Sequence, residues 1–172
     1  MKQIVIINGV SSSGCSSLVD RFCSVVEDGY HKVHVDEYCK QLPSGMWERC
    51  GHSDAGWAEI GKSFNKHLAA LAHRYDRIIA DALYKLPSAS EHLFSTLGRD
   101  RVFFVQLYCE IEELERREAA RGDRPPGLAR SQFNAVYSFD DYDLWIDSTR
   151  KSVDECVKEL WAELSNQALC RS

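Results

Sequence analysis

One short segment near the N-terminus constrains the fold of this chain more than any other part of the sequence. Residues 3–8 read QIVIIN, a near-continuous apolar run typical of a strand that is covered on both faces. The loop GVSSSGCSS follows at residues 9–17, and an apolar helical pattern begins at Leu18. Its two glycines let the backbone curl so that N–H groups point inward, as in anion sites. A strand, a glycine-framed loop and a helix in this order predict a phosphate-binding site.

The rest of the chain repeats this alternation of apolar runs and longer amphipathic segments. The apolar runs predict strands at residues 3–8, 32–36, 77–81, 101–108 and 143–147. The clearest helical spacing covers residues 16–27, 57–74 and 152–164. Alternating strands and helices indicate βαβ units, so we expect an α/β fold of three layers, with a five-stranded parallel sheet flanked by helices. A chain of 172 residues fits one domain, and we expect residues 1–172 to form it.

The loop matches most of the P-loop template, G-x-x-x-x-G-K-[ST]. Gly9, Gly14 and Ser16 occupy their expected places, and the Ser16 hydroxyl would reach Mg²⁺. The loop backbone and the N-terminus of the next helix would hold phosphate groups of ATP. The residues expected to bind the nucleotide are Gly9, Ser11, Ser12, Ser13, Gly14, Cys15, Ser16 and Ser17. A glycine–serine turn that joins a strand to a helix without any ligand is the plainer alternative.

Cys15 stands where the template has lysine. That lysine normally reaches the β- and γ-phosphates and offsets their charge during transfer. A cysteine supplies no positive charge, and losing one such donor lowers a rate by roughly 10²- to 10³-fold. Three explanations stay open: the protein is a weak catalyst, another cation replaces the lysine, or the residue has been substituted. A redox-sensitive thiol is a further hypothesis, because a helix N-terminus lowers the pKa of a cysteine.

Two aspartates are expected near the loop, because each closes a predicted strand and ligands bind at the carboxyl ends of parallel strands. Asp36, in the run VHVD, is the preferred general base for an acceptor hydroxyl, ahead of Glu37 and His34. Asp81, in the run IIAD, suits Mg²⁺ or its water shell. Either aspartate could instead cap the following helix.

An arginine-rich segment suggests a lid. Arg121 and Arg124 flank a glycine and an aspartate in the run RGDRPPGLAR, and guanidinium groups on a closing loop neutralise a transferring phosphate. We therefore expect a lid at about residues 121–130, with Arg121 and Arg124 as catalytic residues. Other arginines nearby are expected to pair with glutamates along a solvated helix.

The segment at residues 42–57 mixes Pro, Gly, Ser and Asp and reads as a loop. We expect it to form part of the acceptor site. Met46, Trp47 and Trp57 would provide apolar walls for the acceptor or, equally, would belong to the core.

Charge and cysteine usage narrow the class of protein. The net charge of −5 argues against a nucleic-acid partner that relies on a broad basic surface. The seven cysteines form no C-x-x-C pair, which is typical of reduced thiols in the cytosol. The apolar run at the N-terminus is too short for a membrane span. We expect a soluble cytoplasmic protein with no membrane partner; the sequence leaves its oligomeric state open.

Five runs in this order make the chain resemble chloramphenicol phosphotransferase and its relatives among the P-loop kinases. They are IVIINGVSSSGCSS, VHVDEY, IIADALY, REAARGDR and YDLWIDSTRKSVDEC. The resemblance implies a central P-loop strand and ATP- and Mg²⁺-dependent phosphorylation of a small-molecule hydroxyl. It also implies that Asp36 is the base, that Arg121 and Arg124 belong to the lid, and that Asp147, Ser148 and Thr149 lie near the nucleotide base. Cys15 departs from the family pattern.

Two functions therefore compete. The first is an ATP-dependent O-phosphotransferase whose partner is a small hydroxyl-bearing acceptor; the sequence identifies neither the acceptor nor a preference for ATP over GTP. The alternative is a catalytically impaired nucleotide-binding protein with a regulatory role, which the absent lysine favours.

Overall fold

The computed structural model describes residues 3–27, 29–43, 45–46 and 53–170. Its centre is one five-stranded sheet in which all neighbouring strands run parallel. The strands are β1 (Gln3–Gly9), β2 (His31–Val33), β3 (Arg77–Ala82), β4 (Val102–Tyr108) and β5 (Leu144–Asp147). Their order is β2-β3-β1-β4-β5, which confirms the expected five-stranded parallel sheet and its central P-loop strand.

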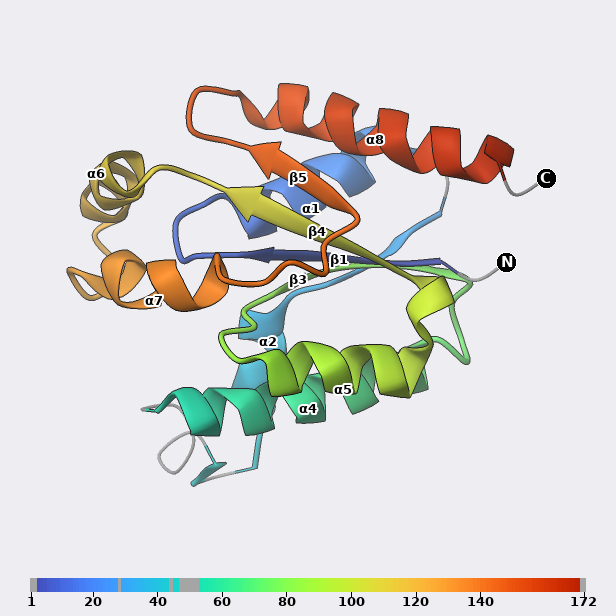
Figure 1. The fold of residues 1–172 in the computed structure, drawn as a ribbon, viewed down its shortest axis with the longest axis horizontal. Coiled ribbons are helices and arrows are strands. Elements are labelled where there is room, and N and C mark those ends of the chain that lie inside the picture. Colours follow the sequence, from blue (N-terminus) through green and yellow to red (C-terminus); the bar gives the residue numbers. More distant parts are fainter. Residues whose placement is uncertain (1–2, 28, 44, 47–52, 171–172) are drawn as a thin grey trace.

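Helices cover both faces of the sheet and one of its ends (Figure 1). They are α1 (Cys15–Val25), α2 (Val35–Lys40), α4 (Asp54–Leu71), α5 (Pro87–Leu97), α6 (Ile111–Arg121), α7 (Leu128–Val136) and α8 (Val153–Cys170). A short 3-10 turn, η1 (Arg99–Arg101), leads into β4. Helices α1 and α8 lie on one face, α4 and α5 on the other, and α6 and α7 stand beyond the arrowheads of the strands.

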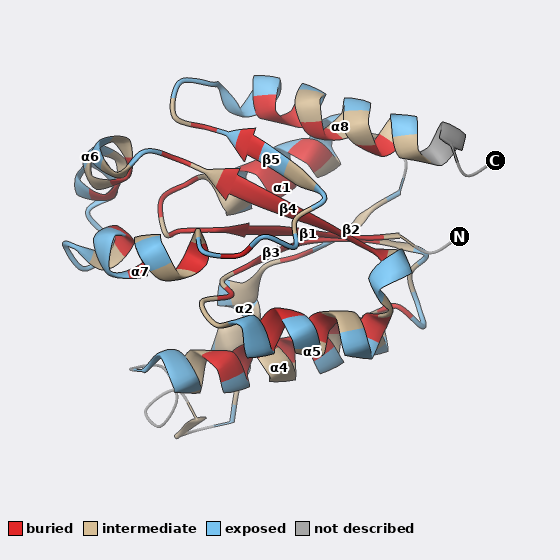
Figure 2. Ribbon diagram, in the orientation of Figure 1, coloured by how far each residue is buried: buried red, intermediate tan, exposed pale blue. Residues whose placement is uncertain are grey.

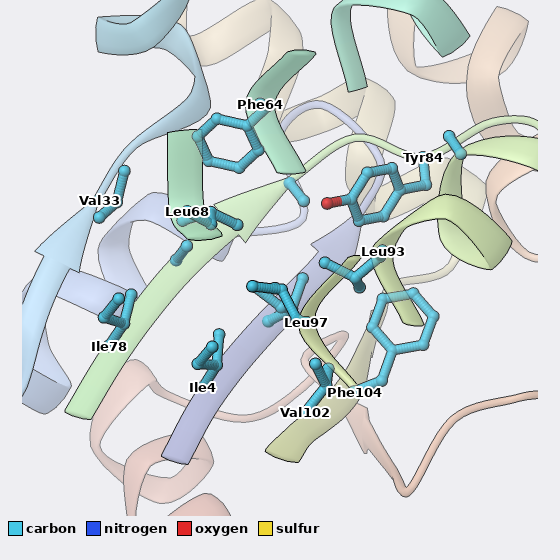
Figure 3. Packing of buried hydrophobic residues seen from close by; sticks show 14 of the residues in the cluster. Ile4, Val33, Phe64, Leu68, Ile78, Tyr84, Leu93, Leu97, Val102 and Phe104 are labelled. Atoms are coloured by element: carbon cyan, nitrogen blue, oxygen red, sulfur yellow. The ribbon is translucent and has the colours of Figure 1, made fainter. Parts of the chain in front are cut away.

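Strand β1 is buried along nearly its whole length (Figure 2). Its alternate residues pack on opposite faces of the sheet, which explains the apolar run from Ile4 to Ile7. Ile4 and Ile6 join a core with α4 and α5, part of which Figure 3 shows. Val5 and Ile7 join a second core with α1 and α8. Each fully buried side chain of this size contributes roughly 1.5–3 kcal/mol relative to an exposed one. The sheet thus needs both helical layers.

A third, smaller core lies under α6 and α7, where the chain passes over the carboxyl ends of the strands. Val10 and Cys109 pack there with Leu114 of α6 and with Ala129 and Val136 of α7. These two helices therefore rest on a packed base of their own.

The end of the second strand differs from the prediction of a strand at residues 32–36. Strand β2 ends at Val33, and Asp36 lies in the first turn of α2. The chain turns early because the backbone N–H of Val35 donates to the Asp81 carboxylate at 2.7 Å, a contact made across the sheet edge. The other four predicted strands lie within one residue of their observed bounds.

Two predicted loops are also shorter than expected. Helix α4 begins at Asp54 because the Ser53 hydroxyl accepts the N–H of Gly56 at 3.0 Å and caps the helix. The segment at residues 42–57 thus includes the first turn of α4, and Trp47 lies outside the described residues. Helix α7 begins at Leu128, inside the predicted lid.

Candidate functional site

The glycine-framed loop curls as its sequence predicts. Gly14 has φ 102° and Ser12 has φ 71°, so two left-handed residues turn the backbone within three positions. The N–H of Ser13 donates to Val10 O at 3.0 Å, and the N–H of Leu18 donates to Gly14 O at 2.9 Å, where α1 starts. At Gly9, a Cβ atom would lie 2.6 Å from Cys15 Sγ and 2.9 Å from Leu107 O, which leaves no room for a side chain.

The Ser12 hydroxyl marks the inside of this loop. Its Oγ is buried and has no hydrogen-bond partner within the described part of the chain. Buried hydroxyls without partners are rare, because each loses its bonds to water. Ser12 also lines both of the cavities described below. A phosphate oxygen bound in the loop would satisfy this hydroxyl.

Cys15 is partly buried and turns back over the loop. Its Sγ lies 3.3 Å from Ser13 Oγ and packs against the core shared with α1 and α8. Burial raises the pKa of the Cys15 thiol to about 12, and the nearby Asp81 carboxylate adds to the increase. The shift is opposite to the decrease expected at a helix N-terminus, and desolvation by burial is its largest cause. Burial therefore disfavours the reactive thiolate form of Cys15 and argues against the redox-sensor hypothesis.

Asp81 lies at the base of the cavity beside the loop and is 4% exposed. One carboxylate oxygen, Oδ2, accepts from the Ser16 hydroxyl at 2.6 Å and lies 2.8 Å from His34 Nδ1. The other, Oδ1, accepts the backbone N–H of Val35. We call these four residues, Asp81, Ser16, His34 and Val35, the floor of the site.

A chain of contacts continues from the floor through His34 to Asp20 and Lys32. Its hydrogen bond with Asp81 raises the pKa of the His34 imidazole, and Asp20, 3.3 Å from Nε2, acts in the same direction. Asp20 in turn accepts from Lys32 Nζ at 2.7 Å. The imidazole therefore fixes the orientation of the Asp81 carboxylate from the side away from the cavity.

The floor has the chemistry that Mg²⁺ prefers, since Ser16 and Asp81 offer a hydroxyl and a carboxylate oxygen side by side. Among the described residues no group of three or more His, Cys, Asp or Glu side chains is gathered for a metal. Mg²⁺ at this floor would thus depend on phosphate oxygens for further ligands.

Asp36 faces the same cavity from the first turn of α2, and its side chain is 49% exposed. Its Oδ2 accepts from Arg124 Nη2 at 2.5 Å, across the cavity from the lid. The Nε of Arg124 is buried without a partner in the described structure, so the guanidinium has a donor to spare. The fold thus brings the predicted base and one predicted lid arginine into contact.

Arg121 ends α6 and pairs with its neighbour Asp123 at 3.0 Å. Both side chains are about half exposed.

Arg117, one turn earlier, contributes more to the site than its sequence suggested. It pairs with Glu113 four residues away, as expected, but it also donates to Ser13 O at 3.2 Å and to Ser148 O at 2.7 Å. Arg117 therefore ties α6 to the loop and to the residues after β5.

Two cavities meet at the loop. The smaller, of about 440 Å³, lies between the loop, α6 and the start of α8, and Ser148 lines it. Asp147 and Thr149 are not among its lining residues. The larger, of about 720 Å³, lies between the loop, the floor and the lid. Ser12, Gly14, Ser17 and Arg121 line both.

The larger cavity holds most of the residues that the sequence singled out. Asp36, Asp81, Arg124 and Trp57 line it, and every predicted loop residue except Ser13 does so too; Ser13 lines the smaller cavity. Met46 is not among the lining residues of either.

Gln132 and Lys85 are among the residues of the larger cavity that sequence reasoning missed. Gln132, on α7, accepts the N–H of Ser11 at 2.9 Å, and Lys85 lies four residues beyond Asp81. The sequence did contain a signal for Lys85, because a lysine shortly after a predicted strand lies at the edge of the sheet where ligands bind. Gln132 had none, because its helix was not predicted.

Five described cysteines, Cys15, Cys23, Cys39, Cys109 and Cys156, are free thiols. None of the described helices combines the length and the apolar character that crossing a membrane requires.

Comparisons with known proteins point in the same direction. The family described as "Chloramphenicol phosphotransferase-like protein" matches residues 2–165 of this chain. A Mycobacterium tuberculosis protein named "Putative O-phosphotransferase" is 24% identical over 180 residues, which cover 92% of this chain and 80% of the relative.

Solved structures of P-loop kinases share the fold. A gluconokinase from Sinorhizobium meliloti has a TM-score of 0.75 at 19% identity and covers 97% of this chain and 94% of its own. An APS kinase from Mycobacterium tuberculosis, solved with AMPPNP and APS, has a TM-score of 0.72 at 21% identity. The match covers 95% of this chain and 98% of the kinase. At these identities the likeness shows the fold, a three-layer P-loop kinase fold, and no more.

Proposed function

The chain belongs to the chloramphenicol phosphotransferase-like family, and from this premise we propose that it transfers the γ-phosphate of ATP to a hydroxyl of a small molecule. One observation carries the proposal. Two separate cavities meet at a single phosphate-binding loop, and Ser12 and Arg121 line both. A two-substrate transfer requires this arrangement, because donor and acceptor must approach one phosphoryl group from opposite sides.

The smaller cavity suits the nucleotide. Arg117 and Ser148 line it, and both are anchored on the backbone of the loop through Ser13 O. The nucleotide would then extend its phosphates through the loop, where the backbone N–H groups and the unpartnered Ser12 hydroxyl would bind them.

The larger cavity would take the acceptor, with Asp36 as its general base. Asp36 is half exposed and has one charged partner, Arg124, on the lid. When a phosphate draws Arg124 away, Asp36 Oδ2 becomes available for the proton of an acceptor hydroxyl. Arg121 and Arg124 would then stabilise the charge on the transferring group.

Ser16 and Asp81 would hold Mg²⁺ at the floor. When bound, this ion neutralises charge on the phosphate oxygens. Asp81 itself is kept in place by His34 and by the N–H of Val35, so the carboxylate needs little rearrangement to act.

The direct test is ATP consumption in the presence of Mg²⁺, with and without a panel of hydroxyl acceptors, for the chain and for Asp36→Asn. We expect acceptor-dependent consumption that falls by roughly 10²- to 10⁴-fold in the variant. Glu37→Gln, one residue along the same exposed helix, is the matched control and should retain activity. Equal rates for the chain and Asp36→Asn would remove Asp36 from the mechanism.

A specific observation also favours a second function, nucleotide binding without transfer. Cys15 gives the loop no positive charge, because a cysteine is neutral as a thiol and negative as a thiolate. In this case nucleotide binding would stabilise one conformation of the lid, and a partner would recognise the lid in that conformation.

Cys15→Lys separates the two functions. Cys15 lines the larger cavity, so a lysine has an open path toward the phosphates. If only the lysine variant transfers phosphate, the chain as written is a binding protein on a kinase scaffold. If the chain itself transfers phosphate, and the variant is faster by up to roughly 10²- to 10³-fold, it is a phosphotransferase that works without the lysine.

A further inference from the structure

Lys85 is the one cation in the larger cavity that neither the lid nor the phosphate loop supplies, within the lining residues that the structure describes. It follows β3, and its side chain is 11% exposed. Its ammonium group lies 5.8 Å from the centre of the Trp57 ring. A lysine is rarely buried to this extent, because its charge must leave water, and it therefore requires an anionic partner.

The carboxylate that pairs with Lys85 in this structure is itself exposed to solvent. Lys85 Nζ contacts Asp54 Oδ1 at 2.5 Å, but the Asp54 side chain is 59% exposed. Because the Asp54 carboxylate is open to solvent, water and dissolved anions can compete with it for Lys85. Asp54 also lies in the first turn of α4, where the helix dipole stabilises a carboxylate without the lysine. Exchange of Asp54 for another anion would leave both charges satisfied.

We propose that Lys85 forms the recognition site for a carboxylate on the acceptor, so that the substrate class is small hydroxy acids. The carboxylate displaces Asp54 from Lys85, an apolar or aromatic part of the acceptor lies against Trp57, and the hydroxyl is directed to Asp36. This inference rests on the proposed function, since it assigns the acceptor of the same cavity.

The arrangement of charges favours an acid over a neutral alcohol or an amine. The described cavity wall has two acidic groups away from the floor, Asp36 and Asp54, each paired with a cation. An amine would have to take Asp54 from Lys85 or Asp36 from Arg124, and either exchange leaves a cation of the cavity without its carboxylate. A neutral alcohol would leave the ion pair between Lys85 and Asp54 in place and would gain no charged contact from Lys85.

The experiment measures binding, so that it does not depend on turnover. A non-hydrolysable ATP analogue with Mg²⁺ fills the phosphate loop, and calorimetry then follows two matched pairs of probes. These are mandelate against 1-phenyl-1,2-ethanediol, and glycerate against glycerol. We expect each acid to bind roughly tenfold to a hundredfold more tightly than its neutral partner, as charged hydrogen bonds do.

Three variants locate the effect. Lys85→Met keeps the stem that packs near Trp57 and should abolish the preference for the acid, whereas Lys85→Arg should retain most of it. Asp54→Asn removes the competing carboxylate and should tighten acid binding by roughly twofold to fivefold. Lys62→Met, at an exposed ion pair on the same helix as Asp54, is the control and should change nothing.

The inference is overturned if the neutral partners bind as well as the acids, if no acid binds, or if Lys85→Met keeps the preference. It is also overturned if Asp54→Asn weakens acid binding. Failure of the proposed function looks different: the acids bind with the expected preference, but no phosphate is transferred. Transfer to neutral alcohols without any preference for acids would preserve the function and reject this site.

Discussion

The floor and the lid of the larger cavity hold their charges in different ways. On the floor, Asp81 is nearly buried and takes part in three hydrogen bonds, with Ser16, His34 and Val35. In the lid region, which here means residues 111–136 (α6, α7 and the predicted lid between them), several charged groups are exposed and pair with a single partner. Arg121 with Asp123, and Arg130 with Glu115, are of this kind.

The difference reflects what each region does. A buried carboxylate with several donors has one orientation, because any rotation leaves donors unpaired in a medium of low dielectric constant. An exposed pair can exchange its partner for water or for a ligand at little cost. The floor is therefore suited to fixed chemistry, and the lid to opening, closing and exchanging partners with a phosphate.

The largest effect is expected from Asp81→Ala. Its removal leaves the Val35 N–H and the Ser16 hydroxyl without their acceptor and should lower the free energy of unfolding by about 3 kcal/mol. Asp36→Ala is the matched control from the exposed side and should lower it by less than about 1 kcal/mol. Urea denaturation measures both. Equal losses would remove the distinction between the buried carboxylate of the floor and the exposed carboxylate that pairs with Arg124 of the lid.

Glu118→Ala should give the next largest effect, because Glu118 is the lid residue most like the floor. It is 5% exposed, and its carboxylate accepts from Gly127 N at 2.6 Å and from Ala129 N at 2.7 Å. It thus caps α7 from α6, and its loss should destabilise the lid by about 2 kcal/mol. Hydrogen exchange of amides in α7 measures this, with Glu115→Ala as the exposed control. Unchanged exchange in Glu118→Ala would contradict the assignment.

A small effect on stability is expected from Arg124→Gln, although Arg124 is central to the proposed chemistry. Its ion pair with Asp36 is partly exposed on both sides, so the free energy of unfolding should change by about 0.5 kcal/mol or less. Phosphate transfer should fall by roughly 10²-fold or more, because a charge donor is lost. Arg130→Gln, which breaks an exposed pair outside both cavities, should leave both quantities unchanged. A loss of stability as large as that of Asp81→Ala would place Arg124 with the floor.

The smallest effect is a pH dependence at the start of the lid. Hydrogen bonds from Arg116 and Arg117 lower the pKa of Glu113 from 4.5 to about 2. Because the folded pKa is the lower one, the pairs stabilise the protein above pH 4.5, and the contribution is lost as the pH falls toward 2. Glu113→Gln should therefore reduce the loss of stability between about pH 6 and about pH 3. Glu112→Gln is the control, and identical pH profiles for the two variants would contradict the prediction.

Local patterns predicted the sheet and the loop well. The alternation of apolar runs and amphipathic segments gave five strands, because a strand covered on both faces is apolar at most positions, as β1 is from Ile4 to Ile7. The spacing of Gly9, Gly14 and Ser16 predicted the curled loop, because that curl depends on residues a few positions apart. The helices α2, α5 and α7 were not predicted, since α2 and α7 are short and their starts depend on distant partners, such as Asp81 for α2 and Glu118 for α7.

The sequence by itself determined the α/β class, the phosphate loop and the absence of its lysine, because each follows from neighbours along the chain. Only the tertiary structure decided which charges meet. Arg124 and Asp36 are 88 positions apart, and Lys85 and Asp54 are 31 apart, on elements whose relative positions follow from packing on the sheet. Tertiary packing also decided the state of Cys15, since burial raises the pKa of its thiol where the helix N-terminus alone predicted a decrease. The physical reason is common to both: pairing and desolvation depend on distances through space, which local sequence patterns do not contain.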